Sequence, residues 1–332
     1  MLHARAPSSS GVEKSESCLA HPPTVRSLTH RAPARFRRYV LQIDSHMRCR
    51  KNWDDFLIST LARCPPAAGL PTRDDGHSMA ILTAYPVGYK LPNEVPNECR
   101  ATLLCPGHFD QKDGLLRSRG RLLAKARRDR ARAGAPFARL FEAPPPNQVE
   151  EAPLRSPLWC AGFSFGSCQM LLQAPYDDIE SESSWRYPFL FFGEELQMAA
   201  RLYTRGFDFF APPCSVFYHL WDRGHRPSFR QIANPSRERL EKESLARVKA
   251  LLQIGAQNPA ANAAAEPPTV GTTHGLGTYR TIEQYEALLG VDLNAQKISP
   301  GAENAGHDPS IFNDSSGPGA GLLALALQMA AS

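Results

Sequence analysis

Residues 41–47 read Leu41-Gln42-Ile43-Asp44-Ser45-His46-Met47, an apolar run that ends in an acidic residue, a small residue and a histidine. Residues i and i+2 of a strand point to the same side, so a buried strand would bring Asp44 and His46 to one cation at the edge of a sheet. A carboxylate with an imidazole suits Mn²⁺ or another divalent cation. The alternative interpretation is a turn at the end of a strand with an incidental histidine.

Apolar segments on both sides of this stretch predict an alternation of strands and helices. The strand is expected over 35–43, with Tyr39, Val40, Leu41 and Ile43 in a core. Asn52-Trp53-Asp54-Asp55 opens a helix that ends at the prolines 65–66. A second buried strand is expected over 79–85. Later strands are expected over 114–121, 159–165, 207–211 and 216–221, and later helices after 194–195, over 237–254 and over 281–289.

The intervening segments differ in composition. Residues 92–106 are expected to be irregular. Residues 117–132 hold eight Lys or Arg residues, which predicts a charged helix face or, alternatively, a patch for an anionic partner. A mobile insertion is expected at about 133–152, where Ala and Pro are frequent. The domain organisation then predicts disorder over 1–34, a catalytic domain over 35–256, a linker over 257–270, a C-terminal motif over 271–297 and a disordered tail over 298–332.

Bulk composition narrows the class of protein. With 332 residues the chain can bury a large core. A net charge of +5 suits a small anionic substrate, and because no nucleic-acid module is recognisable we expect no nucleic-acid partner. The eight cysteines form no CxxC pair, which fits a reducing compartment. No signal peptide and no apolar run of about 18 residues is present, so no membrane span and a cytoplasmic location are expected.

Two adjacent carboxylates, Glu194 and Glu195, follow Phe191-Phe192-Gly193 at the predicted start of a helix. Acidic residues in a first helical turn are favoured by the helix dipole, which is one explanation. The other is catalytic: a carboxylate there could orient an acceptor hydroxyl or stabilise positive charge on a sugar. The sequence by itself leaves both explanations open.

Four further residues are candidates for binding. His219 lies between apolar neighbours, where a histidine is more often a core residue than a ligand. Arg223 and Arg226 could bind phosphate oxygens, although such a pair is usually a solvated surface. Gly162 interrupts an apolar strand, which suggests that the backbone approaches another group closely.

These segments occur in an order that resembles a known family. They are YVLQIDSHMR (39–48) with Trp53, LTAYPVGY (82–89), CAGFSF (160–165), YPFLFFGEELQMAARLYTRGFDFFAP (187–212), VFYHLWDRGHRP (216–227) and HGLGTYRTIEQYEALLGVDL (274–293). The chain resembles the GlcNAc-transferase family typified by the enzyme that glycosylates hydroxyproline on the cytoplasmic Skp ubiquitin-ligase adaptor. A fainter likeness is to the polypeptide N-acetylgalactosaminyltransferases.

The resemblance implies a fold and a set of site residues. The fold is an α/β nucleotide-diphospho-sugar transferase of the GT-A type, a mixed sheet with flanking helices. Mn²⁺ or another divalent cation would be held by Asp44, His46 and His219, and Glu194 or Glu195 would be catalytic. The substrate-binding residues would be Gly162, Phe163, Trp221, Arg223 and Arg226. The implied reaction moves a sugar, GlcNAc from UDP-GlcNAc, with retention of configuration, to a hydroxyl on a protein or glycan acceptor.

One departure from the family pattern concerns the N-terminus. Family members have strands and a uridine-binding loop ahead of the segment equivalent to residues 41–47, where this chain has low-complexity sequence. We therefore expect a sheet without its N-terminal strands. The alternative function is a catalytically inactive glycosyltransferase-like binding protein, or a gene fragment, that has lost the nucleoside pocket.

Overall fold

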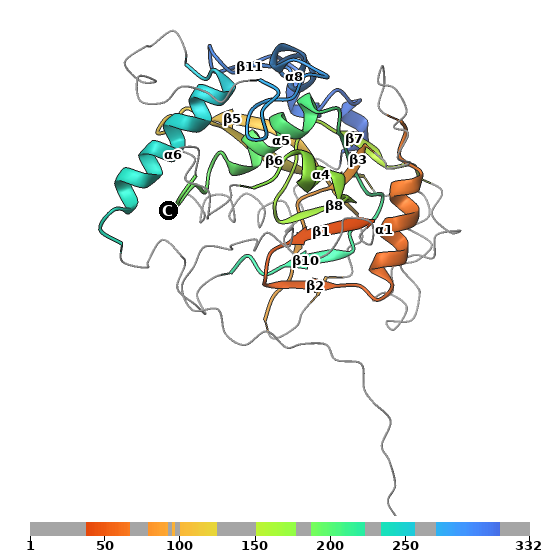
Figure 1. Cartoon of the computed structure of the whole chain (residues 1–332). Coiled ribbons are helices and arrows are strands. Elements are labelled where there is room, and N and C mark those ends of the chain that lie inside the picture. Colours follow the sequence, from red (N-terminus) through yellow and green to blue (C-terminus); the bar gives the residue numbers. More distant parts are fainter. Residues whose placement is uncertain are drawn as a thin grey trace, which may run out of the picture.

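The computed structural model describes residues 38–66, 79–91, 95–96, 100–124, 151–176, 187–222, 234–255 and 270–312. Within them the fold is mixed α/β, with several small sheets and a few helices (Figure 1). The largest sheet has five strands in the order β1-β8-β3-β9-β7. Their bounds are β1 Tyr39–Ile43, β8 Phe163–Ser167, β3 Ala80–Thr83, β9 Asp208–Ala211 and β7 Leu154–Ser156. Only β3 and β9 pair in parallel among these neighbours, so this sheet is mixed.

Strand β1 lies at the edge of this sheet and pairs only with β8 among the described strands. The prediction that Tyr39 and Ile43 enter the core is wrong, because their side chains are 39% and 40% exposed. Leu41, between them, does pack against the core. The strand ends at Ile43, and Asp44 to His46 form a turn into β2 (Met47–Cys49). The expected strand alternation of Asp44 and His46 is therefore replaced by a turn.

A second sheet of three strands completes the region around this turn. Its order is β2-β10-β4, with β10 at Phe217–His219 and β4 at Val87–Gly88. Strand β10 pairs antiparallel with β2 and parallel with β4, which sets His219 opposite both Met47 and Gly88. Figure 1 shows β10 and β2 side by side next to β1. Residues 47 and 219, far apart in sequence, thus pair in one small sheet, and His46 lies in the turn directly before it.

Two hydrophobic clusters flank the five-stranded sheet. One contains Ile81 and Phe209 and is covered by the helices α4 (Gln169–Gln173), α5 (Glu194–Thr204), α6 (Arg237–Leu252) and α8 (Ile282–Leu289). The other contains Leu82, Phe163 and the buried face of α1 (Trp53–Ala62), where Phe56, Leu57 and Leu61 recur at helical spacing. Successive residues of β3 therefore pack into the two clusters on opposite faces of the sheet, because side chains alternate along a strand.

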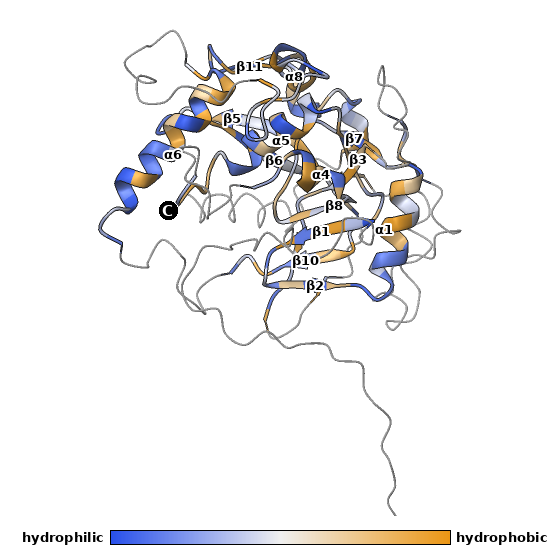
Figure 2. Ribbon diagram, viewed as in Figure 1, coloured by the Kyte–Doolittle hydropathy of each residue, from blue (hydrophilic) through white to orange (hydrophobic). Residues whose placement is uncertain are grey.

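The helices begin and end close to where the sequence predicts. Helix α8 has Thr281 as its N-cap, in a capping box with Gln284. Helix α5 begins after Gly193, whose φ of 99° favours glycine, and ends before Gly206 at a φ of 94°. Helix α6 buries Val248, Leu251 and Leu252 and leaves its charged residues outside, which gives the alternating colours of Figure 2. No described helix is both long and apolar enough to cross a bilayer.

The hairpin of β5 (Thr102–Phe109) and β6 (Leu116–Leu122) corrects the prediction that residues 92–106 are irregular and decides how the basic run begins. Residues 102–106 are not irregular: Pro106 and Gly107 lie at a register shift, where a strand tolerates them. Strand β6 confirms the strand predicted over 114–121, and the start of the basic run 117–132 is not a helix face, since Arg117, Arg119 and Arg121 alternate along β6. Arg117 pairs with Asp110 and Asp113, and its guanidinium lies 3.9 Å from the centroid of the Phe192 ring.

The C-terminal segment is more ordered than predicted. Residues 298–312 include part of the hairpin β11 (Val291–Asp292) and β12 (Lys297–Ile298), and the short helices η5 (Ala302–Asn304) and η6 (Pro309–Ile311). Phe312 is 6% exposed and packs with Leu103 of β5. The predicted disorder is wrong for this part because an aromatic anchor holds it. The predicted segments 1–34 and 257–269, the insertion up to 150 and residues 313–332 lie outside the described residues.

Candidate metal centre

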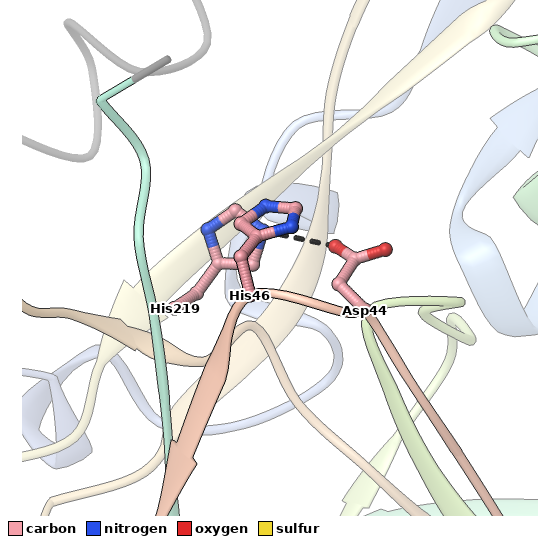
Figure 3. Close-up of side chains that lie close together, drawn as sticks. All are labelled: Asp44, His46 and His219. Carbon is pink, nitrogen blue, oxygen red and sulfur yellow. Dashed lines mark hydrogen bonds and ion pairs between the residues drawn. The ribbon is translucent and has the colours of Figure 1, made fainter. Parts of the chain in front are cut away.

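Asp44, His46 and His219 come together where the two sheets meet (Figure 3). One ligand atom from each of the three lies within 4.8 Å of the others. The turn between β1 and β2 carries Asp44 and His46, and β10 delivers His219 at its end. The backbone N–H of Leu220 donates to the carbonyl of His46 at 3.2 Å, so backbone pairing fixes the spacing of the two histidines.

The distances within this group suit a metal ion. Nε2 of His219 lies 2.9 Å from Oδ2 of Asp44. Neighbouring ligands at about 2.1 Å from an octahedral ion are about 3 Å apart, so these two atoms could bind one cation with little movement. The rings of His46 and His219 have centroids 4.2 Å apart. Two imidazoles and a carboxylate form a donor set that Mn²⁺ and similar divalent ions accept.

Burial is uneven across the three ligands. The side chain of His219 is 1% exposed, whereas that of Asp44 is 43% exposed. His219 is therefore enclosed by the protein, whereas the carboxylate of Asp44 faces solvent. A cation bound there would keep coordination positions open on the solvent side, as a catalytic site requires.

Trp221 is the support for His219. Their ring centroids are 3.9 Å apart, and the Trp221 indole also meets Tyr85 edge-on with centroids 6.4 Å apart. The indole lies directly on Gly88, because a Cβ at that position would approach Trp221 Cδ1 to 2.9 Å. Gly88 thus leaves the space that allows the indole to pack against the histidine.

The predicted residues Gly162 and Phe163 occupy different environments. A Cβ on Gly162 would lie 3.5 Å from Asp44 Oδ2, so the backbone passes close to the candidate ligand as the sequence predicts. Phe163 is 3% exposed, and its ring centroid is 5.1 Å from that of Phe217. Its side chain supports the site from the core, and its backbone continues from Gly162.

Glu194 and Glu195 begin α5 and are held by different groups. Glu194 Oε1 accepts a hydrogen bond from the hydroxyl of Tyr176 at 2.7 Å. Glu195 Oε1 accepts from the backbone N–H of Ala161 at 2.9 Å, and its Oε2 accepts from the hydroxyl of Tyr85 at 3.4 Å. Protein donors therefore occupy both oxygens of Glu195 and one oxygen of Glu194.

Both glutamates have raised pKa values, and Asp44 contributes to each. Burial and the neighbouring charge of Glu195 raise the pKa of Glu194 to about 8, and the charge of Asp44 adds to this increase. Burial also raises the pKa of Glu195, with Asp44 again contributing. Asp44 therefore acts on both glutamates, and a cation at Asp44 would relieve this repulsion.

Residues 32–295 match the protein-family model described as glycosyltransferase (GlcNAc). The chain belongs to the GlcNAc glycosyltransferase family. The match spans every candidate ligand and both glutamates of α5. No curated protein matches the chain.

Two predicted residues of this GlcNAc glycosyltransferase family member, Arg223 and Arg226, lie outside the described residues. They follow Trp221 and Asp222 within the matched range. Their predicted contact with a diphosphate stays a prediction.

The structure adds three side chains that the sequence did not single out: Tyr85, Tyr176 and Gln42. Tyr85 lies just beyond the carboxyl end of β3, a position where α/β sheets place ligand-binding groups. That position could have identified it. Tyr176 and Gln42 gave no such signal, because their role depends on contacts between distant segments.

Proposed function

We propose that this GlcNAc glycosyltransferase family member is a divalent-cation-dependent enzyme that transfers GlcNAc from UDP-GlcNAc to a hydroxyl on a protein or glycan. The observation that carries the proposal is the group of Asp44, His46 and His219, whose ligand atoms lie within 4.8 Å of one another. The family match supports glycosyl transfer. The metal, the donor and the acceptor are the parts that we propose.

Asp44, His46 and His219 would hold the cation. When bound, Mn²⁺ supplies Lewis-acid stabilisation of the negative charge that develops on the leaving diphosphate. The exposed side of Asp44 leaves room for diphosphate oxygens, and His219 is buried against Trp221. By holding the cation, these residues would orient the donor for transfer.

Glu194 is the carboxylate that we assign to the sugar side of the reaction. Its Oε2 has no hydrogen-bond partner among the described residues, whereas both oxygens of Glu195 are used. A fixed carboxylate near the anomeric carbon stabilises the positive charge that develops there. Neutralising Asp44 removes one cause of the raised pKa of Glu194, so Glu194 ionises more readily in the loaded site.

The test is release of UDP from UDP-GlcNAc by the full chain with Mn²⁺, before and after chelation. We expect release that depends on Mn²⁺ and falls by at least about 100-fold in His219→Ala. His108→Ala, which changes an exposed histidine of β5, is the matched control and should keep wild-type activity. A folded chain that neither releases UDP nor binds it by calorimetry in the presence of Mn²⁺ overturns the proposal.

A further inference from the structure

Tyr176 connects the strand that leads into the metal loop with Glu194. Nε2 of Gln42 donates to the hydroxyl oxygen of Tyr176 at 2.6 Å. The hydroxyl of Tyr176 in turn donates to Glu194 Oε1 at 2.7 Å. Gln42 lies on β1 only two residues before Asp44. Two short hydrogen bonds therefore join β1, the segment after α4 and the start of α5.

The direction of the two hydrogen bonds is fixed when Glu194 is ionised, because a carboxylate can only accept. A phenol has one hydrogen to donate, and the amide N–H of Gln42 already points at the phenol oxygen. The hydrogen of Tyr176 is therefore committed to Glu194. Burial and the charge of Glu194 raise the pKa of Tyr176 well above its usual value, so the hydroxyl keeps this hydrogen throughout the working pH range.

The consequence for Glu194 is a fixed carboxylate orientation. A glutamate has three side-chain torsions, and the first turn of a helix does not restrain its carboxyl group. The hydroxyl of Tyr176 holds Oε1, which sets the plane of the carboxylate and leaves Oε2 for another group. Glu195 needs no such arrangement, because the backbone of Ala161 already anchors it.

We propose that Tyr176, oriented by Gln42, is the positioning residue that holds Glu194 for sugar transfer. This inference rests on the proposed function and deepens it, since it explains how the reactive carboxylate keeps its geometry relative to the metal loop. Gln42 makes the link specific: it lies on the same strand that delivers Asp44. The hydroxyl of Tyr176 thereby links the strand that leads to Asp44 with the carboxylate of Glu194.

The first arm of the test is kinetic and uses Tyr176→Phe and Gln42→Leu in the full chain. Loss of a hydrogen bond to a charged group should lower kcat about 10- to 100-fold in Tyr176→Phe, and less in Gln42→Leu. The KM for UDP-GlcNAc and the Kd for Mn²⁺ should stay within about twofold, because the ligand set is untouched. Tyr285→Phe, which removes a buried hydroxyl that donates to the carbonyl of Pro157, is the matched control and should keep full kcat.

The second arm is independent of turnover. NMR of ¹³C-labelled glutamate in the metal-free chain should show Glu194 titrating with a pKa of about 8, assigned with Glu194→Gln. The groups that face Glu194 are Glu195, Asp44 and Tyr176, and only the Tyr176 hydrogen bond lowers its pKa. Tyr176→Phe should therefore raise this pKa by about one unit.

The outcomes separate the two proposals. If wild type releases no UDP but Tyr176→Phe shifts the Glu194 titration, the proposed function fails and the hydrogen-bonded link stands. If wild type is active and Tyr176→Phe keeps kcat, or lowers it no more than Tyr285→Phe does, the positioning role is overturned. An unchanged Glu194 titration in Tyr176→Phe overturns the link itself.

Discussion

The two ends of helix α5 carry opposite charges, and the charged groups at each end have different partners. Its first turn holds Glu194 and Glu195, while Arg201 and Arg205 lie at its other end, about 16 Å away for 11 residues. This polarity agrees with the helix dipole at both ends. The pKa of Glu194 is nevertheless raised to about 8, so its negative charge is poorly neutralised.

The basic end, by contrast, is used to hold the fold together. Arg205 donates to the carbonyls of Thr272, Thr273 and Gly275, which ties the following segment to α5. Nearby, Arg280 and Arg155 both pair with buried Asp208 at the start of β9. At this end of the helix the charged groups are held by protein partners, whereas burial and neighbouring negative charges raise the pKa of Glu194 at the other end.

The largest effect near the basic end of α5 is expected for Asp208→Ala, which removes the carboxylate between Arg280 and Arg155. Arg280, whose side chain is 8% exposed, would lose its carboxylate partner, which for a buried pair costs about 3–5 kcal/mol. Urea denaturation should show this loss. Arg155→Ala, which removes the more exposed partner, should cost clearly less. A loss below about 1 kcal/mol in Asp208→Ala would contradict a structural role for this pair.

Cation binding should affect the acidic end alone. At 100 times its Kd, Mn²⁺ should raise the free energy of unfolding by about 2.7 kcal/mol, because the unfolded chain has no assembled site. Thermal and urea unfolding with and without a chelator measure this gain. His219→Ala should abolish it, and His108→Ala should retain it. An equal gain in His219→Ala would place the cation elsewhere.

Removing the charge of Glu194 should stabilise the metal-free protein. A carboxyl group whose pKa is raised on folding destabilises the folded state as pH rises from the unfolded value of 4.5 to the folded value of about 8. Glu194→Gln should therefore raise the free energy of unfolding by about 1–3 kcal/mol at pH 8, and by almost nothing at pH 4.

The control for this prediction is Glu241→Gln on α6, which changes an exposed carboxylate and should shift stability by less than about 0.5 kcal/mol. Urea denaturation of the wild type and both variants over pH 4–9 tests this prediction. If Glu194→Gln destabilises the protein at pH 8, Glu194 is not a poorly neutralised charge. The same substitution should abolish transfer, so stability and activity are expected to oppose each other at this position.

Local sequence patterns predicted most of the helices and the central strands, because their apolar period is strong. They failed where a local signal points the wrong way. Pro106 and Gly107 argued against a strand that tolerates them at a register shift, and the run of basic residues from Arg117 suggested a helix face where strand β6 continues to Leu122. Phe312 holds a segment whose composition predicts disorder.

The candidate site shows the same division. Asp44, His46 and His219 were predicted from the order of motifs along the chain. Strand alternation does not explain the proximity of Asp44 and His46, because they lie in a turn. Contacts such as Gln42 with Tyr176 join residues 134 positions apart, and no local pattern encodes them.

Gly162→Ala should give the smallest effect, and it tests whether the loop before β8 borders the candidate cation site. The new Cβ would lie 3.5 Å from both Asp44 Oδ2 and Cys160 Sγ, which is ordinary contact, so stability should change by less than about 1 kcal/mol. The methyl group would partly desolvate Asp44, and Mn²⁺ affinity should fall about 3- to 10-fold.

Gly301→Ala, at a φ of 87° with open space around it, should instead cost about 1 kcal/mol of stability and leave Mn²⁺ affinity unchanged. Calorimetry of both variants measures the two effects separately. Equal Mn²⁺ affinity in wild type and Gly162→Ala would show that the loop before β8 does not border the cation site.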